Sequence, residues 1–101
     1  MSNSIIKEDE LTIGRWGRAW QQFMTENYPT EATELKENNR WDELSFEIER
    51  EARAMWELLR KQYAKANPQP TTFVETMKWE NTRGFYVDHE VMEQVVLQFR
   101  A

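Results

Sequence analysis

The longest continuous helical pattern in the sequence runs from Trp41 to Tyr63 and reads WDELSFEIEREARAMWELLRKQY. Its apolar residues recur every three or four positions, which places them on one face of an α-helix. They are Trp41, Leu44, Ile48, Ala52, Met55, Trp56, Leu59 and Tyr63. An apolar stripe that keeps its period over about six turns is typical of a helix that packs on several neighbours. The sequence therefore predicts one long central helix.

A second helical pattern precedes this segment, over residues 12–28. Pro29 ends it, because a proline disfavours helical geometry at the residue before it. Gly14 and Gly17 lie near its start, and each costs ~1 kcal/mol of helix propensity relative to alanine. Two glycines in one turn indicate either a frayed helix start or a close crossing with another helix. A short helix is predicted next, over 31–37.

The C-terminal third begins with a break at 67–70, where two prolines in three residues remove two amide donors and favour extended geometry. Thr72, with a glutamate three positions on, matches a capping box and predicts a helix that Gly84 closes. Asp88 can then cap a last helix. The alternative is a small β-hairpin over 71–87, because this segment is rich in Thr, Phe, Val, Trp and Tyr, which all suit strands.

Together these segments predict an all-α protein, a small bundle of about four to five helices around one long central helix. A chain of 101 residues has the length of one domain. We therefore expect a single helical domain over 1–101, with residues 1–10 flexible and a proline-containing break at 67–70.

Composition and charge narrow the classes of function. There is no cysteine, which excludes disulfides and thiolate metal sites. No apolar stretch approaches the ~18 residues that a membrane span needs, so we expect a cytoplasmic protein without membrane contact. The formal net charge is −5, and the field of an acidic protein repels a phosphate backbone. Direct binding to duplex DNA is disfavoured.

No motif for catalysis, for a cofactor or for a metal stands out. His89 is the only histidine, so a histidine metal cage has no support. The carboxylates of Glu43, Glu47 and Glu51 lie one helical turn apart, but neighbouring arginines offer them salt-bridge partners. We expect a protein that is not an enzyme and that holds no cofactor.

Phe46 is the odd residue of the long helix. It lies two positions from Ile48 and therefore about 160° round the helix from the buried stripe. Leaving a phenylalanine in water forfeits roughly 1.5 to 3 kcal/mol of burial, so either another segment of the chain covers Phe46 or a partner does. With its helical neighbours Arg50, Arg53 and Glu57, it forms the candidate partner-binding site.

Short motifs in a fixed order resemble the TnpV family of transposon-encoded bacterial proteins. They include Ile13-Gly14-Arg15-Trp16-Gly17-Arg18, Met77-Lys78-Trp79 and Glu93-Gln94-Val95-Val96-Leu97. The resemblance covers most of the chain from residue 13 onward. The sequence departs from the family pattern in its acidity, in Asn38-Asn39 in place of a Ser-Gly type turn, and in extra residues around 84–88. The resemblance implies a mobile-element setting and supplies no catalytic residues.

Two classes of function follow. The first is a protein-binding accessory or inhibitor from a bacterial mobile element or phage, which acts on a protein that handles nucleic acid, as anti-CRISPR and anti-restriction proteins do. The acidic surface and an aromatic content of 13% favour this protein-binding class. The second is a DNA-binding accessory of transposition that places the basic residues of the long helix on phosphates. The identity of the target and the oligomeric state stay open.

Overall fold

The structure is a computed structural model that describes residues 12–101. Four α-helices and one π-helical turn follow one another in this part of the chain: α2 (Arg15–Asn27), α3 (Pro29–Glu37), α4 (Trp41–Ala66), α5 (Phe73–Val91) and η1 (Met92–Val96). The predicted all-α bundle around a long helix is confirmed. The alternative β-hairpin over 71–87 is wrong, because residues 73–91 form one helix. The predicted flexibility of residues 1–10 concerns residues outside the described part.

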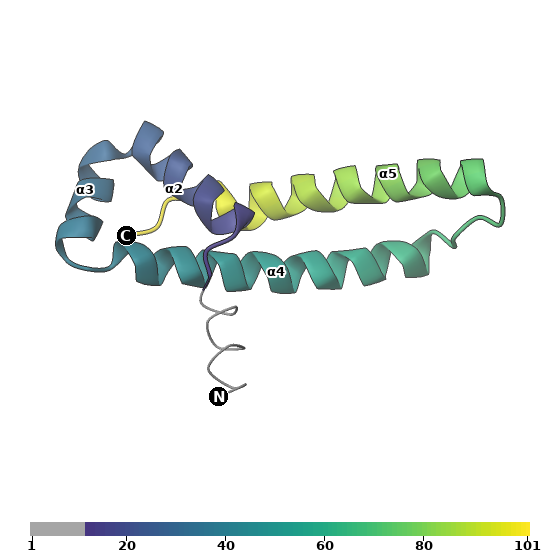
Figure 1. The fold of residues 1–101 in the computed structure, drawn as a ribbon, viewed down its shortest axis with the longest axis horizontal. Helices are drawn as coiled ribbons and strands as arrows, with labels where there is room; N and C mark the ends of the chain where they lie inside the picture. Colours follow the sequence, from purple (N-terminus) through teal and green to yellow (C-terminus); the bar gives the residue numbers. More distant parts are fainter. Residues whose placement is uncertain (1–11) are drawn as a thin grey trace, which may run out of the picture.

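The two longest helices, α4 and α5, run antiparallel side by side, and α2 and α3 lie against one end of this pair (Figure 1). The molecule is elongated, with extents of 53 × 40 × 18 Å. The buried apolar side chains belong to residues 16–52 and 87–96. Residues 53–86, which we call the arm, form the rest of the helical pair and contribute none of them. The core therefore occupies one end of the molecule.

A buried carboxylate holds α2 on α4. The backbone N–H groups of Gly14 and Gly17 both donate to Glu49 Oε1, at 2.9 and 2.8 Å. The guanidinium Nε of Arg53 donates to Glu49 Oε2 at 2.8 Å. The first N–H groups of an α-helix have no partner within the helix, so Glu49 satisfies two of them from a neighbouring helix. Its negative charge also suits the positive end of the α2 dipole.

Gly17 permits this close crossing. A Cβ atom on Gly17 would lie 2.9 Å from the carbonyl oxygen of Ser45 on α4 and 2.6 Å from Cγ2 of Ile13. Atoms do not approach so closely in folded proteins, so any other residue here would push α2 away from α4. Of the two interpretations of the glycine pair, the structure shows the close helix crossing.

α5 begins where the sequence predicts, but it ends well beyond the predicted stop. The side chain of Thr72 accepts the N–H of Glu75 at 3.3 Å, as in a capping box. The predicted stop at Gly84 is wrong, because α5 continues to Val91. A glycine inside a helix costs ~1 kcal/mol. The complete burial of Val87 and Val91 offsets this cost, since each buried side chain contributes roughly 1.5 to 3 kcal/mol.

The predicted capping role of Asp88 is also wrong. Asp88 lies inside the continuous helix, where its carboxylate accepts hydrogen bonds from Arg15 at 3.1 Å and from the indole N–H of Trp56 at 3.2 Å. Asp88 therefore ties α5 to both α2 and α4.

The C-terminal segment closes the core end. The indole N–H of Trp20, which is completely buried, donates to the carbonyl oxygen of Gln98 at 3.2 Å. Both terminal nitrogens of Arg100 donate to the carboxylate of Glu51, each at 2.7 Å. This paired contact lowers the pKa of Glu51 and raises the pKa of Arg100.

Candidate interaction surface

The residues predicted to bind a partner lie together on α4. Phe46, Arg50, Arg53 and Glu57 project from one side of the helix, opposite the buried Ile48. Phe46 is half-buried, whereas the other three are exposed. Arg53 is already bound to Glu49, so it stabilises the α2–α4 contact as well as facing solvent. The assignment of this face to a partner stays a prediction.

The arm exposes large apolar side chains that the sequence interpretation missed. Phe85 is 80% exposed and Phe73 is 79% exposed. The other large apolar residues of the arm that are exposed are Leu58, Val74, Met77 and Tyr86. Single exposed apolar residues are common on protein surfaces, but a concentration of them on one element is typical of an interaction surface.

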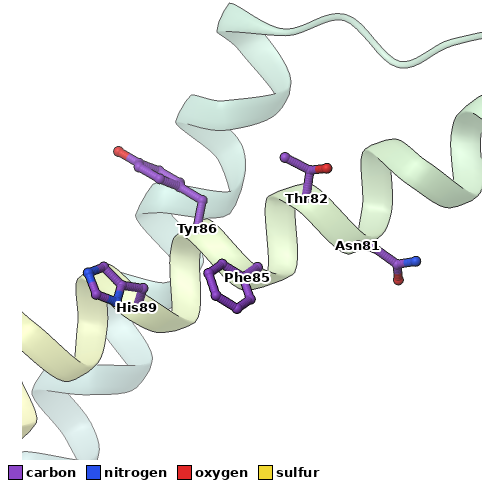
Figure 2. Close-up of a pocket in the computed structure, with 5 residues that line it drawn as sticks. All are labelled: Asn81, Thr82, Phe85, Tyr86 and His89. Atoms are coloured by element: carbon purple, nitrogen blue, oxygen red, sulfur yellow. The ribbon is translucent and has the colours of Figure 1, made fainter.

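Several of these side chains form one row on α5. Phe73, Met77, Asn81, Phe85 and His89 are spaced by four residues, which makes them a ridge along the surface of an α-helix. We call these five residues the outer ridge. Figure 2 shows Asn81, Phe85 and His89 on the near side of α5, with α4 behind the helix. These three side chains therefore point away from α4.

The opposite side of α5 makes the contacts with α4. Tyr63 of α4 packs on Trp79 and on Tyr86, with ring centroids 5.8 and 5.9 Å apart. Beside the outer ridge lies a shallow, open hollow of about 500 Å³, lined by Asn81, Thr82, Phe85, Tyr86 and His89 (Figure 2). Its lining is mostly aromatic and lies at the surface, which suits contact with another macromolecule better than enclosure of a small molecule.

The core end carries most of the negative charge. Residues 26–43, which comprise the end of α2, α3 and the start of α4, hold six carboxylates and two basic side chains. Five of the six carboxylates are exposed, and the sixth, that of Glu31, is partly exposed. We call this segment the acidic end. In Figure 1 α3 lies at the opposite end of the molecule from the turn that joins α4 to α5.

Within residues 12–101, the His, Asp and Glu side chains form no group of three or more that could hold a metal ion. None of the helices in this part of the chain has both the length and the apolar character needed to cross a bilayer.

Comparison with known proteins gives the family. The model of the family described as "Transposon-encoded protein TnpV" matches residues 4–98. This chain belongs to the TnpV family. The match includes every helix from α2 to η1, and it confirms the resemblance seen in the sequence motifs. No curated protein and no solved structure matches the chain. The TnpV family links the protein to transposons.

Proposed function

We propose that this TnpV protein is a non-enzymatic accessory or inhibitor of its mobile element, and that it acts by binding another protein. The observation that carries the proposal is the separation of an acidic end from an arm with uncovered apolar side chains. Aromatic side chains anchor protein interfaces, and charged surfaces select the partner and speed encounter. Both kinds of surface occur on this small chain.

The acidic end favours a target that handles nucleic acid. Such proteins carry basic channels for phosphates, and a surface of carboxylates complements them. Anti-CRISPR and anti-restriction proteins provide precedents for this kind of inhibition. The target would meet the protein in the bacterial cytoplasm, where transposon DNA is handled.

The ionisable side chains support a binding role over a catalytic one. Asp88 pairs with Arg15, and Glu51 pairs with Arg100. His89 is exposed and lies 3.4 Å from Glu93, one turn along the same helical segment. These are contacts between neighbouring polar side chains, and they stabilise helices and their packing.

Neutralising the acidic end is expected to weaken target capture. Changing Glu31, Glu34 and Glu37 to glutamine removes three of its carboxylates. Each charge contributes modestly to a complementary interface, so the three changes together should lower the amount of captured target roughly tenfold. The measurement is affinity capture from a host lysate, with identification by mass spectrometry and repetition at several salt concentrations.

The matched control changes Glu75, Glu80 and Glu93 to glutamine, which alters the net charge equally but on α5 and η1. It should capture as much target as the unmodified protein. Equal capture by both triple variants, or a captured protein that does not handle nucleic acid, would overturn the proposed class of target.

The second candidate is a DNA-binding accessory of transposition. The observation that favours this candidate is a set of basic residues on α4: Arg50, Arg53, Arg60, Lys61 and Lys65. The structure weakens this candidate, because Arg53 is bound to Glu49 and the guanidinium of Arg60 lies over the ring of Trp56, 4.5 Å from its centre.

We therefore expect no measurable binding of the protein alone to duplex DNA at physiological salt, because the net field opposes the several phosphate contacts that such binding needs. A fluorescence polarisation titration with labelled duplexes measures this. Sub-micromolar affinity that weakens steeply with added salt would promote the transposition candidate above the first.

A further inference from the structure

We propose that the arm binds single-stranded nucleic acid, and that two neighbouring hollows of the α4–α5 pair each hold one base. The inference goes beyond the proposed function, which assigns the acidic end to a protein target. It adds a ligand of another class, and it depends on other residues.

The two hollows share the side chain of Tyr86. The first is the open hollow of about 500 Å³ on α5, which Phe85 and Tyr86 line (Figure 2). The second hollow, of about 320 Å³, lies between α4 and α5. Its lining comprises Leu59, Gln62, Tyr63, Ala66, Asn67 and Tyr86. The ring of Tyr86 packs on that of Tyr63, with centroids 5.9 Å apart, so it is held in place beside both hollows.

Each hollow combines aromatic rings with side-chain amides. Asn81 lies beside Phe85 in the first hollow, and Gln62 and Asn67 lie beside Tyr63 in the second. Aromatic side chains stack on the faces of bases, and amides, which both donate and accept, suit their polar edges. A duplex keeps base faces stacked inside, whereas a single strand exposes them. The two linings therefore favour a single strand.

Two lysines lie close to the amides. Lys78 precedes Asn81 by three positions on α5, and Lys65 follows Gln62 by three positions on α4, so each lysine is about one helical turn from an amide. Both lysines are exposed, and neither forms an ion pair or a side-chain hydrogen bond within residues 12–101. Neither lining contains a carboxylate. The lysines are therefore placed to contact the phosphates of a strand whose bases enter the hollows.

The arm is the basic part of an acidic protein. Residues 53–86 hold six basic side chains and three carboxylates, whereas the whole chain holds 13 and 18. One of the three carboxylates, that of Glu80, is paired with Arg83. Outside the arm, Glu93 lies near the first hollow, 3.4 Å from His89. The field of the protein thus attracts a phosphate backbone to the arm and repels it from the acidic end.

Charge alone would also suit an acidic protein segment. Such a segment has no need of rings and amides together in both hollows, whereas a pair of bases uses both. Phe73, Val74 and Met77 lie outside the two linings, so a protein target can still contact the arm while a strand is bound.

Fluorescence polarisation with a labelled thymidine oligonucleotide of about twelve nucleotides tests the proposal. The full chain should bind it with a dissociation constant in the micromolar range at low salt. The logarithm of the association constant should fall with the logarithm of the salt concentration with a slope of about −1.4, as for two phosphate contacts on a single strand. The same oligonucleotide paired with its complement should bind about tenfold more weakly or not at all.

Phe85→Ala should raise the dissociation constant about tenfold, because it removes a stacking ring. The matched control is Phe73→Ala, at a position of α5 that is 79% exposed against 80% for Phe85 but lines neither hollow. It should leave the dissociation constant unchanged. Changing Lys65 and Lys78 together to glutamine should bring the salt slope close to zero. Melting curves should show that all the variants are folded.

Three results would overturn the proposal. They are no binding of the single strand up to about 100 µM protein, equal affinity for the single strand and the duplex, and equal weakening by Phe85→Ala and Phe73→Ala. If Phe85→Ala instead abolished target capture by a protein that binds no single strand, the hollows would belong to the protein target.

The two proposals fail separately when the host lysate is treated with nuclease, so that no target is captured through nucleic acid on the arm. A protein that captures a nucleic-acid-handling target but binds no single strand would overturn this inference alone. A protein that binds the single strand but captures no such target would overturn the proposed function alone.

Discussion

Replacing Gly17 with valine is expected to lower the free energy of unfolding by about 3 kcal/mol. The added side chain would meet the carbonyl oxygen of Ser45, which belongs to the backbone of α4 and cannot turn aside. The clash would push α2 from α4 and lengthen the hydrogen bonds from α2 to Glu49. Urea denaturation followed by circular dichroism measures the loss.

Gly84→Ala is the control for this prediction. Gly84 also lies inside a helix, but a Cβ atom there would have no neighbour within 4 Å. The alanine should therefore raise the free energy of unfolding by up to ~1 kcal/mol through helix propensity. If Gly17→Val, like Gly84→Ala, left the free energy of unfolding unchanged or raised it, the close crossing of α2 and α4 would be wrong.

Glu49→Ala is expected to destabilise the fold by roughly 2 to 5 kcal/mol, because each buried N–H group left without an acceptor costs about 1 to 3 kcal/mol. The Glu49 side chain is only 3% exposed, and its loss leaves the N–H groups of Gly14 and Gly17 without their acceptor. Glu49→Gln keeps an acceptor oxygen and should cost less. Thermal and urea melts of both variants measure the difference.

The neighbouring Glu57→Ala serves as the reference, because Glu57 is exposed on the same helix and its loss should change stability by no more than ~0.5 kcal/mol. A Glu49→Ala variant as stable as Glu57→Ala would show that Glu49 does not hold α2 on α4.

Helical periodicity predicted much of the fold because it is a local property. The apolar stripe of 41–63 predicts α4, which the structure extends to Ala66. The capping pair at Thr72 predicts the start of α5. Both signals depend on residues within one or two turns of each other, so a single sequence contains them in full.

The candidate surface was harder to predict, and Gly84 shows why. A glycine in a helical pattern is compatible with a stop or with continuation, and the packing of Val87 and Val91 on the core selects continuation. With a stop at Gly84, Phe85 and His89 fall on a different element from Phe73. Only an unbroken α5 aligns all five residues of the outer ridge.

Glu49 illustrates a second limit of prediction from the sequence alone. In the sequence it is one of several acidic residues on a charged helix, and nothing local separates it from Glu47 or Glu51. Its burial depends on where α2 crosses α4, which is a contact between residues more than thirty positions apart in the sequence. The glycine pair of α2 signals a close crossing, but it does not name the carboxylate that meets it.

The sequence alone therefore specifies the helices, their start signals and the TnpV motifs, because each is written in residues close together along the chain. The three-dimensional packing specifies which faces stay uncovered. At 1.5 Å per residue, α4 is about 39 Å long, whereas α2 is about 20 Å and α3 about 13 Å. The two short helices cover only one end of the α4–α5 pair, and this difference in length leaves the arm and its outer ridge exposed.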